Sequence, residues 1–375
     1  MTEAVIDVEG LQTLMDALQT RGHTILGPTV REGAIVYDEI TRIGDLPAGW
    51  TDEQDAATYR LTRRDDSALF GFAVGPHSWK KYLFPPETLL WKARRVSDGF
   101  EVKEPAPNGG PFAFLGVRGC ELAAIQVQDR VFLGSHPDPT YSERRSGAFI
   151  IAVNCSSPAG TCFCVSMETG PRAGPGFDLS LTEIIEADRH LFTVDVGSER
   201  GDELLSEIPH GPATTEVERA AEEVIERAAA SMGRSMDTGG IKELLYSNRE
   251  HPRWDNVAQR CLACTNCTLV CPTCFCSTVE DTTDLTGDTA ERWRSWDSCF
   301  TLDFSELGGN NVRSTTRGRY RQWMTHKLAT WIDQFGTSGC VGCGRCITWC
   351  PVGIDITEEV AAIRQSEGGS QHGNA

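Results

Sequence analysis

The sequence predicts an α+β protein built in two parts, and three observations support this prediction. The chain has 375 residues, which is enough for two or three domains. Up to about residue 240, short runs rich in β-branched and aromatic residues alternate with helix-like segments, a pattern typical of an α/β domain. Beyond that point cysteines recur in a repeated spacing, so the second part is expected to be organised around their side chains.

Changes in composition place the boundaries between these parts. Residues 232–240 contain three glycines and few apolar side chains, which is typical of a linker. We therefore predict an N-terminal α/β domain over 1–240, a cysteine-rich domain over 241–365 and a flexible tail over 366–375. The predicted elements of the first domain are strands at 34–37, 68–74, 112–117, 148–153 and 191–196, and an amphipathic helix at 215–230.

Charge and hydropathy exclude two classes of function. The formal net charge is −18, whereas a protein that grips nucleic acid by its phosphates needs a basic face. No stretch approaches 18 consecutive apolar residues, and the N-terminal residues carry an acid rather than a basic region. We therefore expect no nucleic-acid partner, no membrane-spanning segment and a cytoplasmic location. Structural disulfides rarely persist in a reducing cytosol, so something else is expected to hold most of the 15 cysteines.

The cysteine spacing indicates which group binds most of them. The run Cys-x2-Cys-x2-Cys-x3-Cys-Pro begins at Cys261 and recurs, with identical spacing, from Cys340. This run is the bacterial ferredoxin signature, in which three close thiolates bind one [4Fe–4S] cluster and the fourth cysteine reaches the other cluster. The second part is thus predicted to be a dicluster ferredoxin-like domain with an insertion between its two motifs. On the crossed pattern, cluster 1 takes Cys261, Cys264, Cys267 and Cys350, and cluster 2 takes Cys340, Cys343, Cys346 and Cys271.

Two other metal-binding patterns compete with this interpretation. Structural zinc also uses paired Cys-x2-Cys motifs, but it does not explain why a third thiol, the x3 step and the proline all appear twice. The spacing of Cys267, Cys271 and Cys274 also matches a radical S-adenosylmethionine cluster. That alternative would leave Cys261 and Cys264 without a role, so the ferredoxin interpretation is preferred.

Seven cysteines lie outside the repeated motif. Cys120 and Cys155 follow predicted strands, at the strand ends where sites form in α/β sheets. Cys162 and Cys164 would face the same way along an extended segment. A third iron–sulfur cluster on these four is our hypothesis, and buried free cysteines or zinc are the alternatives. The other three, Cys274, Cys276 and Cys299, supply one thiol fewer than a full ligand set, and packing is the preferred interpretation for them.

A basic run lies between the two motifs. It consists of Arg313, Arg317, Arg319, Arg321 and Lys327. Two interpretations are open: a solvated helix face, or a set of cations that neutralise anionic clusters or meet an acidic partner.

Segments beyond the ferredoxin motifs carry a family resemblance. The chain resembles the β subunit of cytoplasmic NAD(P)-linked nickel–iron hydrogenases, also called sulfhydrogenases, and more distantly the corresponding subunit of anaerobic sulfite reductase. In the first domain the resemblance lies in Gly75–Pro86, Leu115–Ile125, Asp138–Tyr141 and Thr161–Met167. In the second it lies in Arg260–Cys276, Trp296–Cys299, Arg319–Arg321 and Gly342–Cys346.

The resemblance implies a function and a set of partners. The protein is expected to be a non-catalytic electron-transfer subunit that relays electrons between a flavin subunit handling NAD(P)H and the small and large subunits of a nickel–iron hydrogenase. The equivalent subunit of an anaerobic sulfite reductase is the alternative. The chain lacks the Asp-Pro-Cys-x-x-Cys ending of a nickel–iron large subunit and has no convincing dinucleotide-binding motif, so the hydrogen and nucleotide chemistry is expected to belong to partners.

Overall fold

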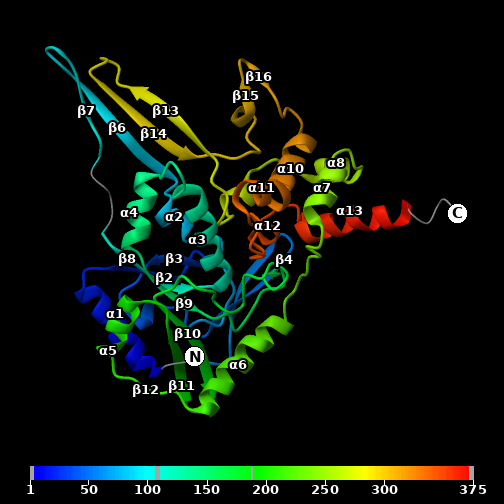
Figure 1. The fold of residues 1–375 in the computed structure, drawn as a ribbon. Helices are drawn as coiled ribbons and strands as arrows, with labels where there is room; N and C mark the ends of the chain where they lie inside the picture. The colour runs from blue at the N-terminus through cyan, green and yellow to red at the C-terminus, as the bar shows by residue number, and fades with distance from the viewer. Residues whose placement is uncertain (1–3, 106–109, 187–188, 371–375) are drawn as a thin grey trace.

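The computed structural model describes residues 4–105, 110–186 and 189–370, and its largest feature is an eight-stranded mixed sheet (Figure 1). The strand order is β12-β1-β11-β10-β9-β8-β2-β3. The pairs in the middle of the sheet, from β10 to β2, are parallel, and the outer pairs are antiparallel. The strands are β1 (Ala4–Asp7), β2 (Thr24–Arg31), β3 (Ala34–Glu39), β8 (Phe112–Val117), β9 (Phe149–Val153), β10 (Leu179–Glu186), β11 (Arg189–Val196) and β12 (Gly211–Pro212).

Helices cover both faces of this sheet, so its central strands are buried on two sides. Ala113 and Leu115 pack into one core with residues of α1 and α5, whereas Phe114, between them, packs into another with residues of α2, α3 and α4. Successive residues of a strand face opposite sides, which explains why β8 and β9 are apolar throughout. The helices of this part are α1 (Val8–Thr20), α2 (Lys80–Leu83), α3 (Gly119–Phe132), α4 (Pro139–Gly147), α5 (Glu199–Ser206) and α6 (Thr215–Ala230).

The α+β class is confirmed, and most of the elements expected in the first part are present. The predicted strands at 34–37, 112–117, 148–153 and 191–196 correspond to β3, β8, β9 and β11, and the helix predicted at 215–230 is α6.

The strand predicted at 68–74 is wrong. This segment is buried but joins no sheet, because side chains rather than a neighbouring strand satisfy its backbone. Glu183 accepts hydrogen bonds from the backbone N–H groups of Leu69 and Phe70. Arg118 donates to the carbonyl oxygens of Phe70 and Phe72.

A second, antiparallel sheet combines strands from both parts of the chain and extends away from the main body at the upper left of Figure 1. Its order is β13-β14-β6-β7, so a hairpin from the insertion between the cysteine motifs pairs with a hairpin from the first part. Its strands are β6 (Glu87–Val96), β7 (Gly99–Lys103), β13 (Ser277–Thr283) and β14 (Thr289–Trp296). Two further hairpins are β4 (Trp50–Asp55) with β5 (Thr58–Arg63), and β15 (Glu306–Leu307) with β16 (Asn310–Asn311).

Short helices around a separate apolar core make up the rest of the chain. This core includes Trp254, Trp323 and Ile363 together with cysteines of both motifs. None of the helices within the described ranges has the length and hydropathy needed to cross a bilayer. The elements are α7 (Ile241–Ser247), α8 (Arg253–Arg260), α9 (Asn266–Leu269), η2 (Asp303–Ser305), α10 (Thr316–Thr325), η3 (His326–Thr330), α11 (Trp331–Phe335), α12 (Arg345–Thr348) and α13 (Ile356–Ser370). A short 3₁₀ turn of the first part, η1 (Ile43–Asp45), packs against the core of the main sheet.

The predicted tail at 366–375 begins inside α13, which continues to Ser370. Residues 371–375 lie outside the described residues. The proposed domain boundary near residue 240 stays a prediction.

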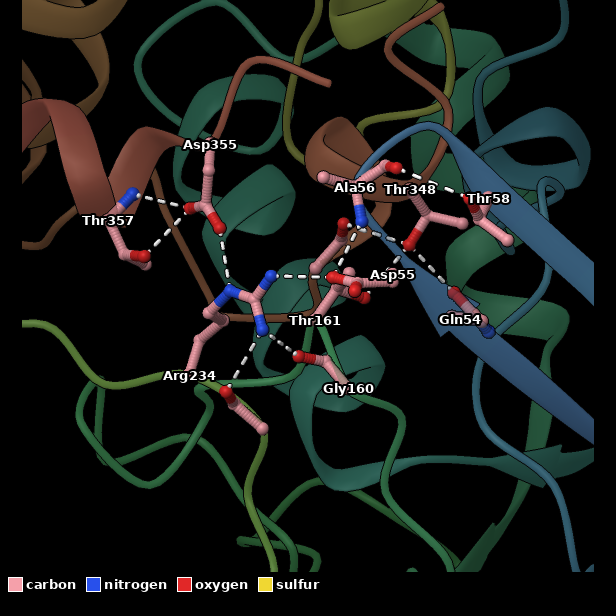
Figure 2. A network of polar contacts seen from close by, with 12 residues as sticks. Gln54, Asp55, Ala56, Thr58, Gly160, Thr161, Arg234, Thr348, Asp355 and Thr357 are labelled. Carbon is pink, nitrogen blue, oxygen red and sulfur yellow. Dashed lines mark hydrogen bonds and ion pairs between the residues drawn. The ribbon is translucent and has the colours of Figure 1, made fainter.

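A polar network joins the sheet part to the cysteine-rich part (Figure 2). Arg234 forms ion pairs with Asp355, at 2.7 Å, and with Asp55, at 2.6 Å. Thr348 donates to Gln54 at 2.8 Å and shares a 2.8 Å hydrogen bond with Thr161. Gln54, Asp55 and Thr161 come from the first part, so side chains far apart in the sequence fix the two parts together.

Candidate iron–sulfur sites

The first motif surrounds a cavity near the surface. Helix α8 ends at Arg260, the chain turns through Cys261 and Cys264, and α9 then carries Cys267. Cys264 is exposed, whereas the other two are partly buried. The cysteines that line this cavity are Cys261, Cys264, Cys267, Cys350 and Cys346. The structure thus brings together the four residues predicted for cluster 1.

The second motif surrounds another cavity, deeper in the protein. Cys271 and Cys340 are buried, and Cys346 lies on α12. The cysteines lining this cavity are Cys271, Cys340, Cys343 and Cys346, the four predicted for cluster 2.

The two motif loops have the same backbone conformation at equivalent positions. Ala263 and Thr265 have φ of 51° and 68°, and Gly342 and Gly344, at the same offsets in the second motif, have φ of 64° and 75°. Left-handed backbone at residues other than glycine is uncommon. The repeat in the sequence is therefore also a repeat in backbone geometry.

The four N-terminal cysteines line a third cavity, although they come from different elements. Cys120 lies in the first turn of α3 and Cys155 follows β9, at neighbouring carboxyl ends of the parallel pair β8 and β9. Cys162 and Cys164 lie in a loop whose Phe163 N–H donates to the Gly342 carbonyl at 2.9 Å. The residues that line this cavity include Cys120, Cys155, Cys162, Cys164 and, from the second motif, Cys343.

The three cavities form a row because neighbouring cavities share a cysteine. Cys343 lines both the N-terminal cavity and the cavity of the second motif. Cys346 lines both that cavity and the cavity of the first motif. The middle of the row is therefore the site formed by Cys271, Cys340, Cys343 and Cys346.

Buried donors without partners test whether these cavities suit an iron–sulfur cluster. Tyr320 Oη and Trp323 Nε1 belong to residues lining the first-motif cavity, and neither has a hydrogen-bond partner among the described residues. The same holds for Arg118 Nε at the N-terminal cavity and for Arg345 Nη1 at the middle one. Unsatisfied buried donors are costly. An anionic cluster, whose sulfurs accept hydrogen bonds, would satisfy them, so the residues present fit such a group.

Thiols gather around all three cavities. Five cysteines line the first-motif cavity, five line the N-terminal cavity and four line the middle one, while among the described residues no three His, Cys, Asp or Glu side chains are grouped to hold a single metal ion. Burial raises the pKa of the Cys120 and Cys162 thiols. Without a cationic ligand such cysteines would stay neutral, whereas metal coordination deprotonates a thiol.

Different residues of the basic run fit each of the two interpretations given for it. Arg317 and Arg321 pair at the surface with Glu250. Lys327, by contrast, is buried and donates to the sulfur of Cys271 at 3.1 Å. One part of the run is thus a solvated face, and its last member contacts a predicted cluster ligand.

The remaining three cysteines lie beside the row and line none of its three cavities. A hydrogen bond links the Cys274 thiol to Cys271. A hydrogen bond with Cys299 lowers the pKa of Cys276 to about 7.

Sequence reasoning missed the donors around the cavities. Tyr320 and Trp323 line the first-motif cavity from about 50 positions beyond its first three cysteines, and Arg118 lines the N-terminal cavity from two positions before Cys120; no recognised motif marks any of the three. It also missed a buried ion pair between Arg345 and Glu121, whose side chains are 0% and 1% exposed. The only available signal was the presence of charged residues beside Cys120, Cys343 and Cys346.

Comparison with known proteins agrees with this geometry. Residues 260–354 match the 4Fe-4S dicluster domain family. The chain is 34% identical over 289 residues to Sulfhydrogenase 2 subunit beta of Pyrococcus furiosus, and the match covers 76% of this chain and 82% of that protein. No solved structure matches the chain. The resemblance inferred from the sequence is thereby confirmed, and the chain belongs to the family of sulfhydrogenase beta subunits.

Proposed function

We propose that the protein is the electron-relay subunit of an NAD(P)-linked nickel–iron hydrogenase complex of the cytoplasm, with three [4Fe–4S] clusters in a row. The observation that carries this proposal is the sharing of Cys343 and Cys346 between neighbouring cavities. Because neighbouring cavities share a lining cysteine, clusters bound in them would be close neighbours. A row of closely spaced one-electron carriers is what a relay requires.

The chain's own residues would bind and insulate the clusters. The thiolates of each cavity would hold the irons, and Tyr320, Trp323 and Arg118, whose buried donors have no partner among the described residues, would supply hydrogen bonds to the cluster sulfurs. Each bound cluster supplies reversible one-electron chemistry, with a potential set by burial and by these hydrogen bonds. No catalytic residue is assigned to this chain.

The first-motif cavity is the proposed end of the row that faces a partner. Cys264 is exposed, and Leu262, which also lines the cavity, is 63% exposed. An electron can therefore enter or leave here across a short distance once another subunit covers this surface.

The proposed partners are a flavin subunit that binds NAD(P)H and the small and large subunits of a nickel–iron hydrogenase. The relative at 34% identity is a sulfhydrogenase subunit, which supports a hydrogenase complex over a sulfite reductase. Co-purification tests this assignment: a nickel-containing partner is expected, and a siroheme-containing partner would contradict it.

Iron and acid-labile sulfide measured on anaerobically purified protein test the number of clusters. We expect about 12 irons per chain, three cubes of four. About 8 would limit the relay to the two ferredoxin-type clusters, and zinc in place of iron would contradict the whole proposal.

Substituting one N-terminal ligand separates the third cluster from the other two. Cys164→Ser is expected to lower the iron content by about four per chain and leave the EPR signals of the other clusters in place. Cys299→Ser is the matched control, because Cys299 lines none of the three cavities. Equal iron in the two variants would remove the third cluster from the proposal.

Interrupting the middle of the row tests the relay itself. Cys343→Ala is expected to stop electron transfer between the partner subunits while each partner keeps its own half-reaction with an artificial electron carrier. Unchanged overall turnover would show that electrons do not pass through this subunit.

A further inference from the structure

Lys327 is a buried lysine in an unusual piece of helix. It lies in the π-helical segment η3, His326–Thr330, which joins α10 to α11. Only 4% of Lys327 is exposed. π-Helical turns are rare and occur frequently at functional sites, and lysine is almost never fully buried without a partner for its charge.

The contacts of Lys327 converge on the middle site. Its Nζ donates to Cys271 Sγ at 3.1 Å, to Thr273 Oγ1 at 3.1 Å and to the Gly339 carbonyl at 3.0 Å. Gly339 immediately precedes Cys340, and its N–H donates back to the Lys327 carbonyl at 2.8 Å. The ammonium group is therefore held against one predicted ligand and beside another.

No carboxylate among the described residues forms an ion pair with Lys327, which distinguishes it from the buried guanidinium at this site. Arg345 is neutralised by Glu121. A buried ammonium without a counterion is unfavourable, so the arrangement calls for an anion at the Cys271 thiol, which Lys327 contacts.

Among the described residues, the first-motif cavity has no cation in hydrogen-bond contact with a ligand sulfur, and Arg319, whose charge acts on Cys261, does not line it. No lysine or arginine is among the residues that line it. Its buried donors are the neutral groups of Tyr320 and Trp323. The two ferredoxin-type sites therefore differ by one uncompensated positive charge in direct contact with a ligand sulfur.

We propose that Lys327 raises the reduction potential of the middle cluster, held by Cys271, Cys340, Cys343 and Cys346, above that of the first-motif cluster. Reduction adds a negative charge, and a nearby ammonium stabilises the reduced form more than the oxidised form. Of the two ferredoxin-type clusters, the middle one is then the more easily reduced. This inference rests on the proposed function, because it requires a cluster on these four cysteines.

Anaerobic redox titration followed by low-temperature EPR measures the effect directly. In Lys327→Met, one cluster is expected to be harder to reduce: at a fixed applied potential its ratio of reduced to oxidised form should fall at least tenfold. For a one-electron couple, a tenfold change corresponds to a midpoint potential about 59 mV more negative. The midpoint potentials of the other clusters should not change. Lys327→Arg keeps the charge and should stay close to the native potential.

Two further variants separate charge from other effects. Lys327→Gln keeps a hydrogen-bond donor without the charge, so it should shift like the methionine variant if the charge is responsible. Lys242→Met removes a surface lysine that pairs with Asp333 and should leave every midpoint unchanged. To assign the shift, the titration is repeated with Cys264→Ala, which removes the first-motif cluster; the cluster that responds to residue 327 must remain.

The outcomes distinguish this inference from the function it rests on. Full iron content with unchanged midpoints in the methionine and glutamine variants would overturn the role of Lys327 and leave the relay intact. Native protein without iron would overturn the relay. If Lys327→Met fails to assemble its clusters, Lys327→Gln and Lys327→Arg still test the role of the charge. The midpoint potential should become more negative in Lys327→Gln and stay close to native in Lys327→Arg.

Discussion

At the scale of single residues, the buried pair of Arg345 and Glu121 links the two parts of the chain. Arg345 also donates to the carbonyl oxygens of Gly75 and His77, each at 2.8 Å. Glu121 also accepts from Tyr37 Oη at 2.6 Å. Burial and the Glu121 carboxylate together raise the pKa of Tyr37, so its hydroxyl remains a donor. Each charge in this cluster therefore has a partner, and removal of one leaves the other buried without compensation.

Glu121→Gln is expected to destabilise the protein by about 3–5 kcal/mol, the usual cost of breaking a buried ion pair from one side. The free energy of unfolding, measured in urea by tryptophan fluorescence under anaerobic conditions, checks this. Glu291→Gln is the control, because the pair of Glu291 with Lys92 lies at the surface and surface pairs contribute little. Similar losses in the two variants would refute the special role of burial.

At the scale of elements, the second motif loop packs against the loop of Cys162 and Cys164. A Cβ atom at Gly342 would lie 2.6 Å from backbone atoms of Phe163 and Cys164, and one at Gly344 would lie 2.5 Å from Thr161. Glycine is thus required here both by positive φ and by close approach. The first motif lacks this contact, which explains why its equivalent positions can be Ala263 and Thr265.

Gly342→Ala is expected to displace the two loops, lowering stability by at least ~1–2 kcal/mol from backbone strain alone and adding a steric clash. Iron should be lost from the N-terminal and middle sites first. Ala263→Gly, at the equivalent position of the first motif, is the matched control and should retain all its iron. Iron analysis and urea unfolding test both variants, and full retention of iron by Gly342→Ala would contradict the proposed close packing.

The limits of sequence reasoning are visible in the same elements. The spacing of Cys261 to Cys271 and its repeat could be read directly, because a motif loop is a local structure. Strand β8 could also be predicted, since its apolar run is continuous. The segment at 68–74 has the same composition, but Glu183 and Arg118 satisfy its backbone from distant positions. Contacts of that kind depend on the tertiary fold, and no local pattern of residues reveals them.

At the scale of the whole molecule, the row of cavities crosses the boundary between the sheet part and the cysteine-rich part. The N-terminal cavity is lined by Cys343 from the second motif, so its geometry depends on how the two parts are docked. The network of Figure 2 supplies part of that docking through Arg234. A weaker contact between the two parts should therefore disturb cluster binding in the N-terminal cavity more than in the first-motif cavity.

Arg234→Met tests this dependence. The Asp355 side chain is fully buried, and among the described residues its carboxylate without Arg234 keeps only the hydrogen bonds from Thr357. The expected loss is about 3 kcal/mol, the lower end for a broken buried pair, because a quarter of the Arg234 side chain is exposed.

The sites should respond in a fixed order. On stepwise addition of an iron chelator, the N-terminal cavity of Arg234→Met should lose its cluster at a lower chelator concentration than in native protein, while the first-motif site, formed within one part, should be unaffected. Arg189→Met removes a surface pair with Glu186 and should behave as native. EPR of the reduced protein follows each site separately. Loss of all clusters together would mean that the boundary does not act on one site in particular, and that the two parts unfold as a single unit.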